Sequence, residues 1–200
     1  TYPLEHNKYL EHNEYKIAFK KKFIINTKYI ILQVANYDFR KNQKMALEAF
    51  VESKVKDASL VFIGSQKNSY TNKLENYARQ LNAQNTVLFL ENLSRNEIMH
   101  AYVSADIFIC SSLSEVQPLV ILDAMNAGVP FISTDVGCVS DLPGGVIVKN
   151  TLQMAEQIKT LIEDEVLRKK LSEEGKKACS EYYSWSTIMD KYEELIKKLK

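Results

Sequence analysis

Six short apolar runs divide the first 150 residues of the chain. They are rich in β-branched and aromatic side chains and are mostly continuous rather than alternating, which is typical of strands buried on both faces of a sheet. Turn residues bound each run. We therefore predict six strands, at residues 28–35, 59–64, 86–90, 105–110, 129–134 and 145–149.

Helical patterns lie between and after these runs, at residues 42–54, 70–81, 94–103, 118–127 and 152–163. Ser94, with Glu97 three residues later, matches a capping box at a helix start. Pro118 suits the first position of a helix, and Gly128 suits the residue just past a helix end. Because strands that alternate with helices are joined by right-handed crossovers, this order predicts a parallel sheet covered on both sides. The expected fold class is α/β, a Rossmann-like doubly wound parallel sheet with a helical C-terminal segment.

Three segments are expected along the chain. Residues 1–22 are polar and lysine-rich, and we expect a weakly held lead-in or the remnant of an interdomain linker; the start at Thr1 rather than Met suggests a piece of a longer protein. Residues 23–183 form the Rossmann-like domain. Residues 184–200 form an amphipathic helix that is expected to pack on this domain, with Trp185 against the core. The apolar stripe of this helix comprises Ile188, Tyr192, Leu195, Ile196 and Leu199.

Composition narrows the classes of partner. Hydrophobic residues make up 46% of the 200 residues, which is enough for a sizeable core. The 26 Lys and Arg residues nearly balance the 25 Asp and Glu residues, so no overall field draws the protein to nucleic acid or to an anionic bilayer. Any bound anion must therefore be held locally.

The cysteines and the apolar runs bear on the compartment. Cys110, Cys138 and Cys179 form no C-x-x-C pair, which disfavours a redox or zinc site and fits a reducing compartment. No apolar run approaches the roughly 20 residues that span a bilayer, and no signal peptide is evident. We expect a cytoplasmic protein.

In open parallel sheets, ligands bind beyond the carboxyl ends of the strands, where loops gather and helix N-termini present unpaired N–H groups. The chemistry of this chain is therefore expected in the loops that follow Ala35, Gly64, Leu90, Cys110 and Thr134. The helix predicted from Pro118 makes the fourth of these loops a candidate anion site, because the positive end of a helix favours a phosphate.

Two carboxylates mark the loop and helix after Cys110. Glu115 lies in the turn before the helix, and Asp123 lies in its second turn, on the side of the same crevice if the register is right. Carboxylates accept hydrogen bonds from hydroxyls, so beside an anion site they fit a ligand that carries both phosphate and hydroxyls, such as a nucleotide sugar. Local sequence alone favours a simpler alternative, in which Glu115 stabilises the helix start by about 0.3–1 kcal/mol and Asp123 faces water.

The stretch SSLSEVQPLVILDAMNAGVPFISTDVG, residues 111–137, resembles the signature of retaining GT-B glycosyltransferases of family 4. That pattern has a Glu, seven residues, a second Glu, Ala-Met and a Gly-x-Pro-x-Ile strand; Glu115 and Asp123 take the two acidic positions. The similarity extends from about Lys28 to Leu199. It implies an enzyme of two Rossmann-like domains, of which this chain looks like the C-terminal, nucleotide-sugar-binding one. The N-terminal domain, which mainly binds the acceptor, would be missing.

The resemblance also implies roles for individual residues. Asp123 would accept hydrogen bonds from the ribose hydroxyls, and Glu115 would accept them from hydroxyls of the donor sugar. Lys41 would neutralise the diphosphate as a point charge. Glu115 and Lys41 are thus the expected catalytic residues. The N–H groups expected to hold sugar or phosphate are those of Val116, Gln117 and Leu119. The residue expected to border the base, within segment 91–93, is Leu93.

Three positions depart from the family pattern. Ala35-Asn36 stands where Gly-Arg is usual, so a second phosphate-binding cation is absent unless Arg40 substitutes for it. Asp123 is one methylene shorter than the usual Glu. Glu91 replaces the usual Gly after the third strand, where the base should approach. Asn36 and Arg40 are therefore the expected donor-binding residues of a variant or weakened site.

The function implied by the resemblance is transfer of a hexose-type sugar from a UDP-sugar, or as second choice a GDP-sugar, to a polysaccharide or glycolipid. Lys41 and the helix end would stabilise the leaving diphosphate without a protein-bound metal, and no Asp-x-Asp motif is present. The chain alone is expected to bind donor and to transfer no sugar. The lysines at 20–22 leave open contact of the full-length enzyme with lipid headgroups at the inner face of the membrane.

Three other classes of protein stay open at this point. A non-catalytic binding or interaction domain would retain the fold and lose the site, as the changes at Asn36 and Glu91 suggest. An NAD-dependent oxidoreductase is disfavoured because the first strand leads into ANYDFRKNQ, without a G-x-G-x-x-G turn. A phosphate-receiver domain needs an acidic cluster after the first strand, and Asp38 alone is poor support.

Overall fold

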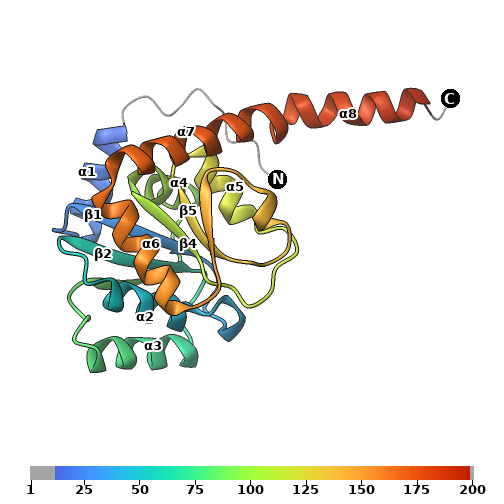
Figure 1. Ribbon diagram of the computed structural model, residues 1–200. Helices are drawn as coiled ribbons and strands as arrows, with labels where there is room; N and C mark the ends of the chain where they lie inside the picture. Colours follow the sequence, from blue (N-terminus) through green and yellow to red (C-terminus); the bar gives the residue numbers. More distant parts are fainter. Residues whose placement is uncertain (1–11, 199–200) are drawn as a thin grey trace.

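The computed structural model describes residues 12–198 and shows a parallel sheet between two layers of helices (Figure 1). The strands pair in the order β3-β2-β1-β4-β5-β6, and every adjacent pair is parallel. The six predicted strands and the doubly wound α/β fold are therefore confirmed. The strands are β1 Tyr29–Val34, β2 Ala58–Gly64, β3 Val87–Glu91, β4 Ile107–Cys110, β5 Phe131–Thr134 and β6 Gly145–Val148.

The described helices are α1 His12–Phe23, α2 Gln43–Ser53, α3 Ser69–Gln80, α4 Arg95–Ser104, α5 Leu119–Asn126, α6 Thr151–Glu163, α7 Glu165–Tyr182 and α8 Trp185–Lys198, with short 3₁₀ helices η1 Phe39–Lys41 and η2 Val139–Asp141. Successive strand residues point to opposite faces of the sheet. In β1, Ile30 and Leu32 belong to a core with α1, α4, α5 and α7, whereas Ile31 belongs to a core with α2, α3 and α6. None of these helices is both long and apolar enough to cross a membrane.

The predicted helix ends agree closely with the structure. Ser94 caps α4, with its backbone N–H donating to the Glu97 carboxylate at 2.6 Å and its hydroxyl accepting from the Glu97 N–H at 3.3 Å. Gly128 lies just past α5 with a φ of 71°, a left-handed conformation that favours glycine. Pro118 is the N-cap of α5 rather than its first helical residue, a shift of one position.

The segment before the first strand differs from its prediction. Part of the expected lead-in at 1–22 forms helix α1, which packs against α4 rather than being weakly held. Tyr15, Phe19 and Phe23 recur every four residues, so they form a stripe on one face of the helix. Phe19 is buried in the core, and the other two pack against it. Residues 1–11 lie outside the described part of the chain.

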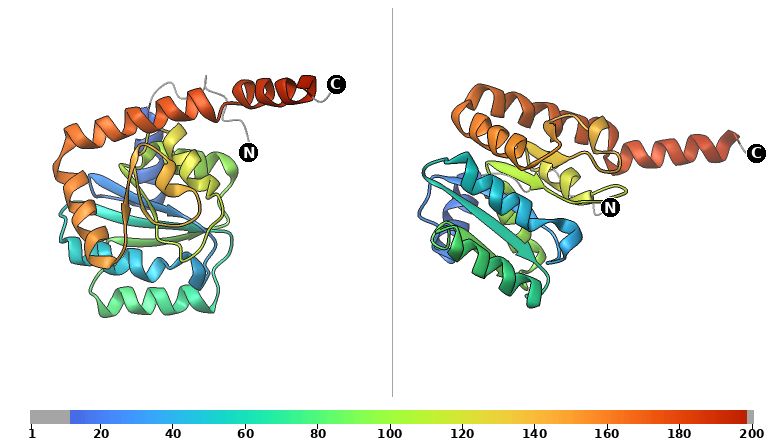
Figure 2. Two further views of the ribbon diagram at one scale, coloured as in Figure 1. Left: turned by 45° about the vertical axis from the view of Figure 1, so that its right-hand side comes forward. Right: turned by 60° about the horizontal axis from the view of Figure 1, so that its bottom comes forward.

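The C-terminal helix also differs from its prediction. Helix α8 extends away from the rest of the molecule (Figures 1 and 2), and none of its described residues is buried. Trp185, which was expected to pack against the core, is 46% exposed. The predicted amphipathic helix is therefore present over residues 185–198 but does not pack on the domain, because its stripe meets no partner surface within residues 12–198. Leu199, the last residue of the predicted stripe, lies outside the described part of the chain. The exposed apolar residues of α8 are Trp185, Met189, Tyr192, Leu195 and Ile196.

Deleting residues 185–200 should leave the stability of the domain almost unchanged, because α8 buries no described side chain. Changes at surface positions are usually within about 0.5 kcal/mol, so the midpoint of thermal unfolding should shift by less than about 2 °C. Circular dichroism on the full and shortened chains measures this shift. A fall of more than about 5 °C would show instead that the helix contributes to the core as the sequence suggested.

Candidate functional site

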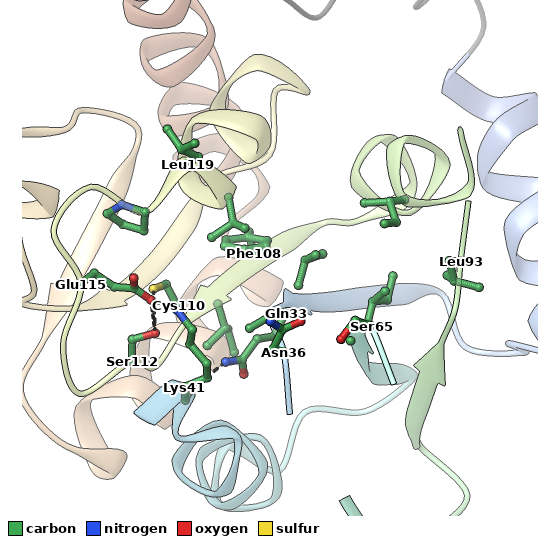
Figure 3. A pocket seen from close by; sticks show the side chains of 18 of the residues that line it. Gln33, Asn36, Lys41, Ser65, Leu93, Phe108, Cys110, Ser112, Glu115 and Leu119 are labelled. Atoms are coloured by element: carbon green, nitrogen blue, oxygen red, sulfur yellow. Dashed lines mark hydrogen bonds and ion pairs between the residues drawn. The ribbon is translucent and has the colours of Figure 1, made fainter. Parts of the chain in front are cut away.

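A pocket of about 690 Å³ opens at the carboxyl ends of β1, β2 and β4. The pocket lies between β1 and β4, where the strand order reverses. The helices that follow these two strands cover opposite faces of the sheet, which leaves a crevice between their first turns. Figure 3 shows Lys41, Ser112 and Glu115 on one side of the pocket and Ser65 and Leu93 on the other. The position is the one that the doubly wound fold predicts for a ligand.

An ion pair forms the polar side of the pocket. Lys41, at the end of η1, and Glu115, in the loop after β4, approach to 2.6 Å between Nζ and Oε1. Their side chains are 29% and 16% exposed, so both charges are largely shielded from water. The Ser112 hydroxyl donates to the same carboxylate oxygen at 2.7 Å. Hydrogen bonds between charged partners are stronger than neutral ones, so this group of three side chains has a defined geometry.

Buried polar groups hold the backbone beneath Lys41. The Gln33 amide donates to the Lys41 carbonyl at 3.0 Å, and the Ser111 hydroxyl donates to the same carbonyl at 2.9 Å. The Leu113 N–H donates to the Arg40 carbonyl at 2.7 Å. These bonds join the loop after β1 to the loop after β4, so the two charged residues are held by a common backbone network.

The loop after β5 supports the Glu115 turn from the other side. Gly137 has a φ of 59°, and a Cβ there would lie 2.2 Å from the Val116 carbonyl oxygen. The Cys138 N–H donates to that oxygen at 3.3 Å, and the Thr134 hydroxyl donates to the Ser112 carbonyl at 2.6 Å. Glycine is therefore required at 137 by both conformation and space.

Most of the predicted site residues meet at this pocket. The predicted residues that line it are Asn36, Lys41, Leu93, Glu115, Gln117 and Leu119. Arg40 and Val116 do not line it: the Arg40 guanidinium pairs with Asp38 at 3.1 Å, and the Val116 side chain projects outward with the residue 88% exposed. The structure thus gives no second cation at the pocket from Arg40.

Asp123 does not line the pocket either. It lies on α5, where its charge acts on Tyr102 and Cys179. Burial raises the pKa of Asp123 above its ordinary value, and the positive charge of Arg95 opposes this only in part. The structure therefore brings Lys41 and Glu115 together at the pocket, whereas Asp123 lies outside its lining.

Glu91 does not obstruct the pocket. Its carboxylate accepts from the Lys67 N–H at 2.7 Å and is engaged with the loop after β2. Asn92 and Leu93 line the pocket instead, and Asn92 has a φ of 55°. Because Asn adopts the left-handed conformation more readily than most residues, Asn92 takes the turn in which glycine would be expected.

Sequence reasoning missed several residues of the site. Gln33 is 2% exposed and is the polar residue within the apolar run IILQVA, a position that should have signalled a specific hydrogen-bonding role. Ser112, also 2% exposed, gave no comparable signal because serines are common in loops. The remaining side of the pocket is apolar, with Val34, Ile63, Leu93, Ile98, Phe108 and Val120 in its wall.

The pocket suits a ligand with separate anionic, hydroxyl-bearing and flat apolar parts. Lys41 attracts an anion, Glu115 accepts from hydroxyls, and the apolar wall accommodates a ring. Within residues 12–198, no group of three or more His, Cys, Asp or Glu side chains has the arrangement to hold a metal ion.

Residues 14–178 match the family described as "Glycosyl transferases group 1". This match covers most of the chain, so the chain belongs to that family. The resemblance drawn from residues 111–137 is confirmed at this level, and the fold is that of the C-terminal half of a GT-B glycosyltransferase.

Individual relatives show the extent of the similarity. Spore coat protein SA of Bacillus subtilis (strain 168) is 27% identical over 182 residues, which are 83% of this chain and 48% of that protein. The C-terminal domain of the group 1 family protein LpcC from Francisella tularensis is 24% identical, with a TM-score of 0.78 over 92% of this chain and 96% of that domain. Anabaena Alr3699/HepE, solved in complex with UDP and glucose, is 17% identical, with a TM-score of 0.87 over 98% of this chain and 55% of that protein. The chain spans about half the length of the curated relatives it matches.

Gly137→Ala should lower both stability and ligand binding. A left-handed conformation costs an alanine about 1–2 kcal/mol, and the clash with the Val116 carbonyl adds about 1–3 kcal/mol. Gly128→Ala is the matched control, because Gly128 has a φ of 71° but its Cβ would meet side-chain atoms alone, the Ser172 hydroxyl oxygen at 3.3 Å and the Lys176 Cδ at 3.8 Å. Urea unfolding should therefore show a loss of roughly 1–2 kcal/mol for the control and more for Gly137→Ala. Equal losses would contradict this role of Gly137.

Asp123→Asn should stabilise the protein at neutral pH. Burial raises the pKa of Asp123 in the folded state above its ordinary value of 3.8. At pH values between the unfolded-state and folded-state pKa, the folded protein holds a proton that the unfolded chain has lost. The free energy of unfolding therefore falls as the pH rises through this range. The asparagine removes this penalty. Thermal unfolding at a series of pH values should show the variant more stable than the wild type at pH 7, by a difference that shrinks towards about pH 4. A difference that is constant with pH would exclude this cause.

Proposed function

We propose that this chain is the nucleotide-sugar-binding half of a retaining glycosyltransferase, and that it holds a UDP-sugar or, as second choice, a GDP-sugar at the pocket between β1 and β4. The observation that carries the proposal is the pairing of Lys41 with Glu115, at 2.6 Å, inside that pocket. A cation suited to a diphosphate stands beside an acceptor-only carboxylate suited to sugar hydroxyls. Membership of a glycosyltransferase family supports the reaction class.

Lys41 and the start of α5 would stabilise the leaving diphosphate. Gln117, Pro118 and Leu119 line the pocket at the N-terminus of α5, where unpaired N–H groups and the helix dipole favour negative charge. Negative charge develops on the diphosphate as its bond to the sugar breaks, so fixed positive groups at this position lower the barrier. On this proposal the stabilisation needs no protein-bound metal.

The rest of the donor would extend towards the apolar wall. The base would lie near Leu93, and Glu115 would receive hydroxyls of a hexose. The similarity to Alr3699/HepE, which was solved with UDP and glucose bound, supports UDP as the first choice. Contacts of Arg40 and of the Val116 N–H with the donor stay predictions, and Asp123 would reach the ribose only through a water or a local rearrangement.

The complete enzyme would have a second domain. We expect a polysaccharide or glycolipid acceptor, bound mainly by an N-terminal domain, for which the greater length of the curated relatives leaves room. On this proposal the chain by itself binds donor and transfers no sugar. The full-length enzyme would work in the cytoplasm, with Lys20 and Lys21 of α1 facing the inner side of a membrane, while Lys22 pairs with Glu97.

Isothermal titration with UDP and with GDP tests the donor site. We expect saturable heat for at least one of them, and Lys41→Met should weaken its binding at least tenfold, because a charge-assisted hydrogen bond is worth about 1.5–3 kcal/mol. Lys44→Met is the matched control. Lys44 lies one turn further along, on α2, where it pairs with Glu48 at 3.6 Å on the surface, and its loss should leave binding unchanged.

Two results would count against the proposed function. If neither nucleotide gives saturable heat, the non-catalytic domain suggested by the changes at Asn36 and Glu91 is the better conclusion. If a nucleotide binds but Lys41→Met and Lys44→Met behave alike, the ligand is held elsewhere. Detectable sugar transfer by the purified chain would contradict the expectation that it is inactive alone.

A further inference from the structure

We propose that Glu115 makes the free site discriminate against a nucleoside diphosphate that carries no sugar. This inference rests on the proposed function, because it assigns a second effect to the same pocket. In it, Glu115 acts on the anionic part of the ligand by repulsion, in addition to any hydrogen bond that it accepts from the sugar. The result is a site that prefers the intact donor to the product left after transfer.

The pocket has no net charge with which to attract a diphosphate. Lys41 and Glu115 are the charged residues among those described as lining it. Since their charged atoms are only 2.6 Å apart, a diphosphate that approaches Lys41 must also approach Glu115. Both side chains are largely shielded, so water and salt screen this repulsion less than they would on an open surface.

Donor and product differ in charge at this place. In a nucleotide sugar the terminal phosphate is esterified and carries one negative charge. In a free nucleoside diphosphate it carries nearly two at neutral pH, because the second pKa of a phosphate is about 6. The additional charge appears where the sugar was attached, which on the proposed function is beside Glu115.

Donor and product also differ in what they offer Glu115. Sugar hydroxyls donate hydrogen bonds and replace Lys41 as the partner of the carboxylate, while a free diphosphate offers only acceptors. A shielded charge that loses its partner is strongly disfavoured. Glu115 therefore exchanges Lys41 for sugar hydroxyls when the donor binds, whereas it loses Lys41 without a replacement when the bare diphosphate binds.

Ser112 keeps the carboxylate from turning away. Its hydroxyl donates to Glu115 Oε1 at 2.7 Å, and its carbonyl is fixed by the Thr134 hydroxyl at 2.6 Å. Moving Glu115 out of the pocket would break the first of these bonds. Ser112→Ala removes the bond and keeps the charge, so it separates the effect of position from the effect of charge.

Isothermal titration of the full chain tests the inference with two pairs of ligands, UDP with UDP-glucose and GDP with GDP-mannose. Glu115→Gln should bind the free nucleoside diphosphate about three- to tenfold more tightly than the wild type, the size expected for a partly shielded charge pair. It should bind the sugar nucleotide no more tightly. The preference for donor over product should therefore fall by at least the same factor, and Glu115→Ala should reproduce the gain for the diphosphate.

The controls assign the gain to the charge of Glu115. Glu48→Gln removes a surface charge of α2 instead and should not tighten binding of the diphosphate. Ser112→Ala keeps the charge of Glu115 but frees the carboxylate to turn away, so its gain should be smaller than that of Glu115→Gln. If both Glu115 variants, shown to be folded by thermal unfolding, bind the diphosphate no more tightly than the wild type, the inference is wrong. The proposed function then still stands, provided that Lys41→Met weakens binding. If the wild type binds none of the four ligands, the proposed function and the inference fail together.

Discussion

The site depends on a buried network that fixes the Lys41 carbonyl between two loops. Gln33 projects from β1 and Ser111 follows β4, and both donate to that one oxygen. A buried donor without a partner costs roughly 1–3 kcal/mol, so the network resists separation of the loops. Because β1 and β4 are neighbours whose helices cover opposite faces, the crevice above them stays open. The place of the lysine is thus determined by strands that carry no charge themselves.

The carboxylates of Glu115 and Asp123 lie near each other in the sequence but in different surroundings. Glu115 has a cation and a hydroxyl as partners, so its charge is compensated in the free protein. Asp123 lies on α5 outside the lining of the pocket, and burial raises its pKa although the charge of Arg95 opposes this. Shielding costs both groups, and Glu115 has partners at hydrogen-bonding distance in Lys41 and Ser112. On the proposed function, a ligand at this pocket would therefore exchange partners with Glu115, whereas it would have to reach beyond the pocket lining to contact Asp123.

Local patterns were sufficient for the fold. The continuous apolar runs predicted all six strands, and the capping box at Ser94 predicted the start of α4, because these signals are contained in a few neighbouring residues. The two ends of the chain were not predictable in this way. Helix α1 is held by its contact with α4, and the stripe of α8 meets no surface within residues 12–198. Both outcomes are set by partners distant in the sequence or outside the described residues.

The difference between local patterns and contacts with distant residues also explains which site residues the sequence placed correctly. Lys41 and Glu115 follow strands whose carboxyl ends share one edge, so topology alone brings their backbones together. Arg40 is the neighbour of Lys41, but successive residues of a 3₁₀ helix point about 120° apart, and Asp38 holds its guanidinium elsewhere. Gln117 and Leu119 needed only the position of the helix start. Side-chain direction within a turn or helix is decided by local contacts that spacing does not reveal.

A pocket with one cation gives the backbone a larger share of anion binding. Helices α3, α4, α6 and α7 each begin with a side chain that accepts from their first N–H groups, whereas α5, at Pro118, and α2, at Asn42, have no such cap among the described residues. A side-chain acceptor there would compete with a ligand for the same donors. Asn36 in place of an arginine removes a charge, but it leaves these N–H groups unaffected. On the proposed function, anion binding at this site therefore depends on how the Glu115 turn presents the start of α5, and Gly137 supports that turn.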